Sequence, residues 1–351
     1  MTLGRFGRFR IPVLLGAIGL TLMLMVAYQL NPIAPARRIR QIFGLQSAGL
    51  EPVDYTAALI YLIERRRMED IPHSLGEAQR NIPWRRQWPI ILFHTGDYDT
   101  EDSRNEFFSV IRENEWSRDV YHQLRNRIEF VKLNFKLPPG VPDDKSIYKP
   151  QVSEEKWPGM LLGLRRVYTL TYTALLLGYQ HMCRFYAQQI FFHPRIANLT
   201  YYIRLDTDSF VTKPLCFDPI HRIHRNRRVY AYNRITPDEG YVVRGMWNLI
   251  DRYSRAHPEI EERLRHNKWP WPEGREDWIT NGIIYDGIGV PAYSNNFEIV
   301  KIEAFQRPDV VAWIDEIMKD PDRIYSLRWG VLDFAPSPAY SNLKRLIFDH
   351  R

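Results

Sequence analysis

The stretch Tyr201-Tyr202-Ile203-Arg204-Leu205-Asp206-Thr207-Asp208 places two carboxylates directly after an apolar, aromatic run. Aromatic and β-branched residues suit a pleated surface, so this run predicts a buried strand that ends at Asp206. In α/β proteins, ligands bind at the carboxyl ends of the strands. Mn²⁺ and Mg²⁺ prefer oxygen ligands and are often held by carboxylates together with substrate phosphates. The stretch therefore predicts a metal site that grips a nucleotide diphosphate.

The same spacing of acids occurs at two other places. Asp97-Tyr98-Asp99 follows the strand-like run 89–94, and the preceding Gly96 indicates an ordinary strand-ending turn. Asp320-Pro321-Asp322 follows a helical pattern, and the proline between the acids predicts a helix-ending turn. Spacing alone does not decide between Asp206/Asp208 and the first rival. If the site is real, we expect its two side chains to face an open crevice and to be free of structural ion pairs.

Composition narrows the classes of partner. The chain has 351 residues, 45% of them hydrophobic, and a net charge of +7, which favours anionic ligands without selecting one. The densest basic run, 221–228, lacks the aromatic residues of a nucleic-acid surface, so no nucleic-acid partner is expected. A solvated face or contact with a diphosphate or an anionic acceptor remain alternatives for that run. Neither a Gly-x-Gly-x-x-Gly nor a Walker loop is present, which argues against dinucleotide oxidoreductases and P-loop kinases.

The N-terminus predicts a membrane anchor. Residues 11–30 carry no charged side chain, and twenty helical residues span about 30 Å, the thickness of the hydrocarbon core. A cleaved signal peptide with Ala34-Pro35-Ala36 as its cleavage site is the competing interpretation. We expect a tail over 1–10, a transmembrane segment over 11–30 and almost the whole protein on one side. The two cysteines, Cys183 and Cys216, could pair in an oxidising lumen.

The remaining sequence predicts an α/β domain with a mainly parallel central sheet. Residues 31–85 are interpreted as a stem with some helix around 55–67, and residues 86–351 as the catalytic domain. Strands interleaved with helices are typical of this class. The strands are expected at 89–94, 128–133, 201–205, 229–232 and 282–285, and the helices at 102–127, 161–192, 240–254 and 303–319.

Two further segments offer candidate site residues. On the helix around 177–186, Arg184 could reach a phosphate, whereas His181 and its apolar neighbours are better explained as packing residues. In 295–299, expected at a strand edge, a carboxylate at Glu298 could stabilise positive charge on a sugar carbon or act as a nucleophile. By itself Glu298 is more easily explained as a surface residue.

Several separated motifs resemble the fungal Golgi α-1,2-mannosyltransferases of glycosyltransferase family 15. The resemblance covers roughly 160–350 and weakens over 86–158. The motifs that carry it are Gly178-Tyr179-Gln180-His181-Met182-Cys183-Arg184-Phe185-Tyr186, Phe192-His193-Pro194, the strand with its acidic pair, Asn296-Phe297-Glu298-Ile299 and Arg328-Trp329-Gly330.

The resemblance implies a GT-A-type fold and a role for each matching residue. Asp206 would hold Mn²⁺ against the diphosphate of GDP-mannose, and Asp208 would support it from the donor side. Glu298 matches the family's candidate nucleophile. The other expected donor-binding residues are Tyr179, Arg184 and Arg204. His350 matches a metal-binding histidine, while the family's Trp-Gly-Asp-Ala-Pro reads Trp329-Gly330-Val331-Leu332-Asp333-Phe334-Ala335-Pro336 here.

The resemblance also implies a single-pass type II protein of the Golgi membrane with a lumenal catalytic domain. The expected activity is retaining, Mn²⁺-dependent transfer of mannose from GDP-mannose to a hydroxyl of a glycan or glycoprotein, forming an α-1,2 linkage. Two alternatives stay open. One is a non-catalytic, membrane-anchored partner of a glycosylation complex, suggested by the altered Trp-Gly motif. The other is a transferase that uses another nucleotide sugar.

Overall fold

The computed structural model describes residues 53–139, 141 and 169–325, apart from 239, 241, 242, 286, 288 and 295, together with 327 and 329. From Asp54 onward the chain forms one compact unit. The expected tail and anchor over 1–30 and the expected metal ligand His350 lie outside the described residues. None of the helices in the described part of the chain combines the length and apolar character that a membrane span requires.

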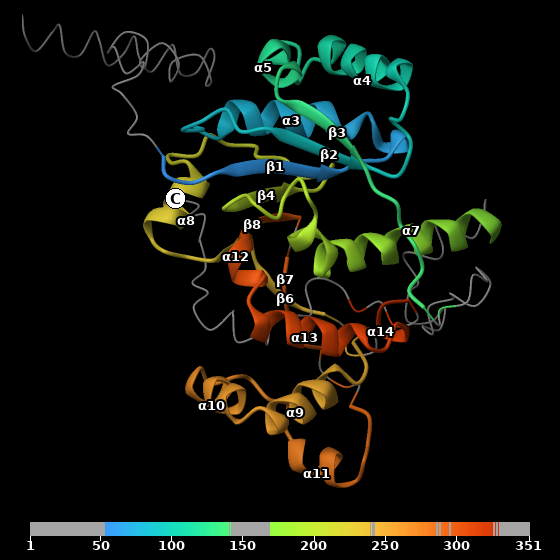
Figure 1. Ribbon diagram of the computed structural model, residues 1–351, viewed down its shortest axis with the longest axis vertical. Coiled ribbons are helices and arrows are strands. Elements are labelled where there is room, and N and C mark those ends of the chain that lie inside the picture. The colour runs from blue at the N-terminus through green and yellow to red at the C-terminus, as the bar shows by residue number, and fades with distance from the viewer. Residues whose placement is uncertain are drawn as a thin grey trace, which may run out of the picture. The chain divides into compact units, whose positions relative to one another are not determined.

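A six-stranded sheet forms the centre of this unit, in the order β3-β2-β1-β4-β8-β5 (Figure 1). The strands β3, β2, β1 and β4 are mutually parallel, and β8 runs antiparallel between β4 and β5. The mainly parallel sheet is therefore confirmed. The strands are β1 (Ala57–Leu62), β2 (Ile90–His94), β3 (Ile128–Lys132), β4 (Tyr201–Leu205), β5 (Tyr230–Tyr232) and β8 (Phe297–Lys301). A separate antiparallel ribbon pairs β6 (Ile235–Pro237) with β7 (Pro291–Tyr293).

Helices cover both faces of the sheet (Figure 1). The helices α3, α4 and α5 lie on one side of it, and α7, α12 and α13 lie on the other. The bounds are α3 (Asp70–Asn81), α4 (Glu101–Glu113), α5 (Tyr121–Arg125), α7 (Thr169–Ala187), α8 (Pro219–Arg225), α9 (Met246–Ala256), α10 (Pro258–His266), α11 (Arg275–Thr280), α12 (Ile302–Phe305), α13 (Pro308–Met318) and α14 (Asp322–Tyr325), with short 3₁₀ turns η1 (Arg65–Arg67) and η2 (Gln189–Phe192).

The two faces of the sheet follow from the alternation of side chains along each strand. On one face, Ala58 and Ile60 of β1 pack with Phe185 and Tyr186 of α7 and with Ile314 of α13, in one buried cluster. The opposite face packs against α3, where the hydroxyl of Tyr61 bonds to Ser74 over 3.0 Å. Both faces are covered, so the central strands are apolar throughout, as parallel strands require.

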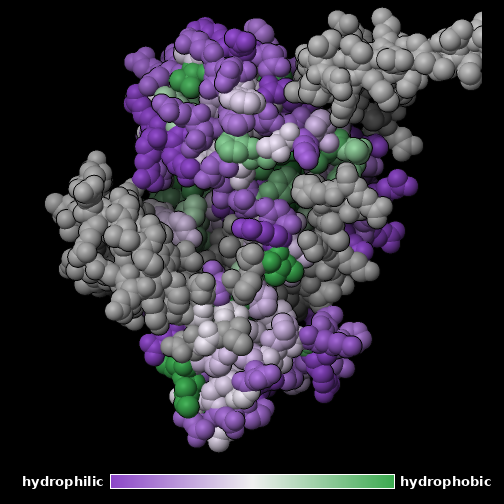
Figure 2. Space-filling view, turned by 180° about the vertical axis from the view of Figure 1, so that it is seen from behind, coloured by the Kyte–Doolittle hydropathy of each residue, from purple (hydrophilic) through white to green (hydrophobic). Residues whose placement is uncertain are grey.

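A second core lies beside α13. Trp247 of α9, Trp278 of α11 and Trp313 of α13 are buried in one aromatic cluster with the apolar side of α10. Figure 2 shows a mainly hydrophilic surface over the α3–α5 end of the molecule, while the α9–α11 end is paler and carries scattered apolar spots. The helices α9, α10 and α11 thus extend the domain beyond the layers of the sheet.

Three sequence expectations are wrong. The interpretation of 31–85 as a stem is wrong for its described part, because β1 is an inner strand of the sheet, paired with both β2 and β4, and α3 covers one face. Residues 31–52 lie outside the described residues. The helix expected around 55–67 is replaced by β1 and the turn η1. The strand expected at 282–285 is absent from the described residues of that segment, where Ile283 and Ile284 are exposed.

Gly76 provides a test of how closely α3 packs. A Cβ added at Gly76 would lie 1.8 Å from the backbone oxygen of Trp116, which cannot rotate away. Gly76→Ala should therefore destabilise the fold by about 1–3 kcal/mol, the usual cost of overpacking. Gly178→Ala, at a helical position of α7 where an added Cβ meets nothing within 4 Å, is the control and should stabilise by up to about 1 kcal/mol. Melting temperatures measure both, and equal shifts would contradict the packing.

Candidate active site at the end of β4

The acidic pair lies at the carboxyl end of β4, as predicted. The backbone of Asp206 is fixed there because its N–H donates to the carbonyl of Asn296 over 3.1 Å and its carbonyl accepts from Ser209 over 2.9 Å. The side chains of Asp206 and Asp208 are 36% and 52% exposed. Because β1, β2 and β4 are parallel, the segments that follow them meet at one edge of the sheet, the edge where ligands bind in such folds.

Asp206 is held by Arg204 of the same strand. The two residues are two positions apart and so point to the same face. The Nε and Nη2 atoms of Arg204 donate to Oδ1 of Asp206 over 3.1 and 2.9 Å. The Arg204 side chain is only 2% exposed, and its guanidinium lies 3.6 Å from the centroid of the Tyr186 ring on α7. A buried guanidinium thus fixes one oxygen of Asp206, and Oδ2 accepts no hydrogen bond from the described residues.

Glu298 lies opposite Arg204 in the register of β4 and β8. Its side chain is 1% exposed, with Oε1 3.8 Å from Nη1 of Arg204. The hydroxyl of Tyr202 donates to Oε1 over 3.2 Å and that of Tyr230 to Oε2 over 2.7 Å. The expectation that Glu298 lies at a strand edge, on the surface, is wrong. It belongs to an inner strand, and both its oxygens are occupied inside the layer between the sheet and α7.

Burial raises the pKa of the Glu298 carboxyl above its ordinary value, against the opposing effects of the Arg204 charge and the two tyrosine hydroxyls. Glu298 is thus protonated at a higher pH in the folded chain than an exposed glutamate would be. To act as the predicted nucleophile, Glu298 would have to contact a sugar carbon. This contact requires the hydrogen bonds from Tyr202 and Tyr230 to break.

Asp208 has a different partner. Nη2 of Arg67, in the turn after β1, donates to Oδ2 of Asp208 over 2.9 Å, and Nε of Arg67 donates to Asp70 over 3.2 Å. The Arg67 side chain is 46% exposed. The expectation that the acids are free of ion pairs is therefore wrong for both of them, since each carboxylate has an arginine partner. One arginine is buried and the other is at the surface.

The loop after the acids is fastened to α3. Ser74 donates its hydroxyl hydrogen to the carbonyl of Ser209 over 2.6 Å, and Asn81 donates to the carbonyl of Val211. Downstream, the carboxylate of Asp218 caps α8 by accepting from the N–H groups of Ile220 and His221. The helix that the sequence placed in a stem thus positions the acidic loop.

The residues expected on α7 have separate surroundings. Arg184 donates from Nη1 to the carbonyl of Lys136 over 3.1 Å, and Tyr179 is 39% exposed. His181 bonds through Nδ1 to the hydroxyl of Tyr325 over 3.0 Å, and burial lowers its pKa, in agreement with a packing role. Tyr186 is the α7 residue whose ring lies against Arg204, the partner of Asp206, and the sequence suggested it only as packing. Tyr186 lies seven residues, or two helical turns, after Tyr179, so the two side chains share one face of α7. This spacing is the sequence signal that could have indicated Tyr186.

The rival acidic pairs have local structural roles. Oδ2 of Asp97 accepts from the backbone N–H of Arg65 over 2.8 Å, and Asp99 pairs with Lys132. Asp320 accepts from the N–H of Asp322 over 3.1 Å in the turn between α13 and α14, as predicted. Cys183 is a buried thiol and Cys216 an exposed one, so the suggested disulfide between them is not formed.

The acids fit part of a metal site. Asp206 and Asp208 are two partly exposed carboxylates one residue apart, and Oδ2 of Asp206 accepts no hydrogen bond from the described residues. Such a pair suits a hard cation that keeps its other positions for water and phosphate. Within the described residues, no group of three or more His, Cys, Asp or Glu side chains is arranged to hold a metal. Further ligands would come from substrate, water or segments outside the described part, where His350 lies.

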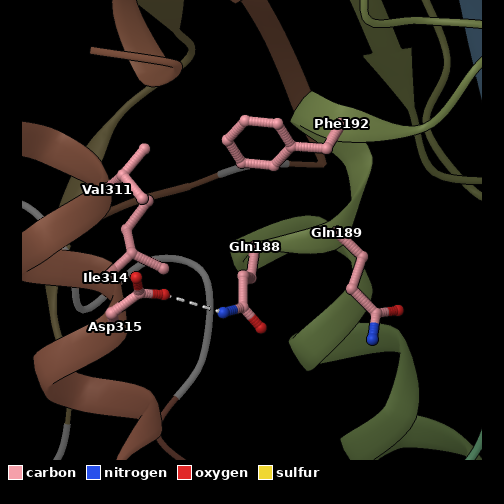
Figure 3. A pocket seen from close by; sticks show the side chains of 6 residues that line it. All are labelled: Gln188, Gln189, Phe192, Val311, Ile314 and Asp315. Atoms are coloured by element: carbon pink, nitrogen blue, oxygen red, sulfur yellow. Dashed lines mark hydrogen bonds between the residues drawn. The ribbon is translucent and has the colours of Figure 1, made fainter. Parts of the chain in front are cut away.

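Three pockets formed by described residues lie away from the acids. One of about 300 Å³ lies between η2 and α13, and Figure 3 shows Gln188 bonded there to Asp315 beside Phe192. A pocket of about 520 Å³ lies against Trp247 and Trp271, and another of about 360 Å³ lies between α9 and α14. None of these three pockets contains Asp206 or Asp208, so the open crevice expected at the acids is not among them. The candidate site rests on the acids and their partners alone.

The raised pKa of Glu298 predicts a pH-dependent stability. A carboxyl whose pKa is higher in the folded than in the unfolded chain stabilises the fold below its unfolded pKa of about 4.3, and this contribution is lost as pH rises through the folded value. As the pH rises above about 4, the free energy of unfolding should therefore fall more steeply in the wild type than in Glu298→Gln. Urea denaturation measures both slopes. Glu303→Gln, at an exposed position, should keep the wild-type slope, and a wild-type slope in Glu298→Gln would contradict the assignment.

Comparison with known proteins supports the resemblance that the sequence motifs suggested. The model of the glycolipid 2-alpha-mannosyltransferase family matches residues 166–336. The O-glycoside alpha-1,2-mannosyltransferase omh1 of Schizosaccharomyces pombe is 25% identical over 155 residues, and the alpha-1,2 mannosyltransferase KTR1 of Saccharomyces cerevisiae is 22% identical over 156. Each alignment covers 44% of this chain and 36% of the relative, so the chain matches about a third of the length of these proteins.

Solved structures show the same fold. The mannosyltransferase Ktr4p of S. cerevisiae superposes with a TM-score of 0.55 at 16% identity, covering 82% of this chain and 66% of Ktr4p. Core-mannan synthase A of Aspergillus fumigatus gives 0.56 at 17% identity, covering 86% and 74%. The expected glycosyltransferase fold is confirmed, and so is the expected resemblance to glycosyltransferase family 15, which the family model supports over residues 166–336.

Proposed function

We propose that this chain transfers mannose from GDP-mannose to a hydroxyl of a glycan or glycoprotein, with an α-1,2 linkage and retained anomeric configuration. The observation that carries the proposal is the acidic pair at the carboxyl end of β4, inside the segment that the family model matches. The names of omh1 and KTR1 support the linkage. Structures of relatives in a Mn/GDP form and in complex with GDP support the donor nucleotide and the metal.

In this proposal Asp206 and Asp208 hold Mn²⁺, with His350 as a further ligand. A divalent cation bound there would neutralise charge on the departing diphosphate. Arg204 orients Asp206, because its fork fixes Oδ1 and leaves Oδ2 without a hydrogen bond from the described residues. Tyr179 and Arg184 on α7 are proposed to line the donor pocket. Glu298 would face the anomeric carbon only after release from Tyr202 and Tyr230.

The cellular setting is part of the proposal. We propose residues 11–30 as a signal anchor that leaves the catalytic domain in the Golgi lumen, because the charge-free segment is long enough for a bilayer. Protease protection of the domain in sealed Golgi vesicles tests this orientation.

A non-catalytic partner of a glycosylation complex is the second candidate. It is favoured by the occupied state of all three carboxylates, since Asp206, Asp208 and Glu298 already have protein partners. A rise in melting temperature with GDP plus Mn²⁺, together with hydrolysis of one member of a panel of nucleotide sugars, would exclude it and identify the donor.

Asp206→Asn tests the proposed site. The amide keeps an oxygen for Arg204 but lacks the charge that a cation needs, so Mn²⁺-dependent mannose transfer should fall on the order of 100-fold or more. Asp99→Asn, in the rival pair at the end of β2, should retain activity to within a few-fold. Transfer from GDP-mannose to a mannoside acceptor is measured with each purified variant. Undiminished transfer by Asp206→Asn would remove the residue from the mechanism.

A further inference from the structure

Asp206 and Asp208 form an acidic tip at the end of β4, and they differ in how firmly their arginine partners are held. Asp206 is paired with a buried guanidinium and Asp208 with an exposed one. In both pairs the arginine neutralises a carboxylate that would otherwise attract a divalent cation. A cation that binds at the acidic tip must therefore compete with Arg204 for Asp206 and with Arg67 for Asp208.

Arg204 cannot leave its place without disrupting the interior. Its guanidinium stacks on Tyr186, lies beside the buried Glu298 and is covered by α7. Moving it away would leave Glu298 as a buried carboxylate without its nearest positive charge, which is costly. Arg204 therefore stays on Oδ1 of Asp206, and a cation can use only Oδ2 of that residue.

Arg67 can leave Asp208 at little cost. Its side chain is about half exposed, it lies in a single 3₁₀ turn, and its Nε already bonds Asp70 on the same side. Withdrawal from Asp208 keeps the contact with Asp70, three residues away in sequence. Exposed pairs of this kind contribute little to stability, because water and salt replace the partner readily.

We propose that Arg67 is a built-in counter-cation that neutralises Asp208 in the metal-free protein and is displaced when a divalent cation binds. The affinity for the cation is then set by competition with Arg67, while Arg204 keeps Asp206 in place in both states. This inference rests on the proposed function only in that a divalent cation binds at the acidic tip.

Arg67→Gln tests the competition without turnover. Without its competitor, Mn²⁺ should bind roughly two- to five-fold more tightly, the factor that an exposed ion pair is worth. Arg66→Gln is the matched control, because Arg66 is the adjacent residue, is similarly exposed and pairs with Glu64 instead of Asp208. Arg66→Gln removes one positive charge, as Arg67→Gln does, and so corrects for the effect of net charge on Mn²⁺ binding. Dissociation constants come from Mn²⁺ titrations of the full chain, followed by calorimetry or by electron paramagnetic resonance at low salt.

A double-mutant cycle completes the test. In the Asp208→Asn background, Arg67→Gln should no longer tighten Mn²⁺ binding, because the shared partner is gone. The inference is overturned if Arg67→Gln matches Arg66→Gln, if it weakens binding, or if the wild type binds no Mn²⁺. A mannose-transfer assay on the same preparations separates the two proposals, since the predicted Mn²⁺ pattern without transfer would refute the activity and leave the role of Arg67 intact.

Discussion

The Arg204 guanidinium is the interaction on which the site depends. It lies inside the layer between the sheet and α7, stacked on Tyr186, with Glu298 on one side and Asp206 at the rim. A buried charge is tolerated only where opposite charges and hydrogen bonds compensate for lost water. The glutamate within the sheet and the aspartate at its edge provide that compensation, so the position of the exposed acid is tied to the packing of the core.

This arrangement explains why the antiparallel strand matters. The pairing of β8 with β4 sets Glu298 directly opposite Arg204, and the pairing of β5 with β8 brings Tyr230 within reach of the carboxylate. A shift of one residue in either register would turn these side chains to the other face. The loop after the acids is fixed independently by α3.

The sequence predicted what is local and missed what is distant. The strand before Asp206 and the position of the acids follow from residue types in one short run, and both are confirmed. The run Ala57–Leu62 is as apolar as β4, but its flanking prolines and arginines suggested a stem, and only its neighbours in the sheet reveal its place. Ile283 and Ile284 have the strand-like side chains but no described strand partner. The partners of the acids could not be predicted, since Arg67 is 141 residues from Asp208 and Tyr202 is 96 from Glu298.

The most direct measurement compares the wild type with Arg204→Lys in the presence and absence of saturating GDP and Mn²⁺. Lysine keeps the buried charge beside Glu298 but lacks the fork that fixes Oδ1 of Asp206. The account predicts that GDP with Mn²⁺ raises the melting temperature of the wild type, and that Arg204→Lys still unfolds cooperatively but loses this rise. An equal rise in both proteins would contradict the claim that the buried guanidinium positions the acidic tip.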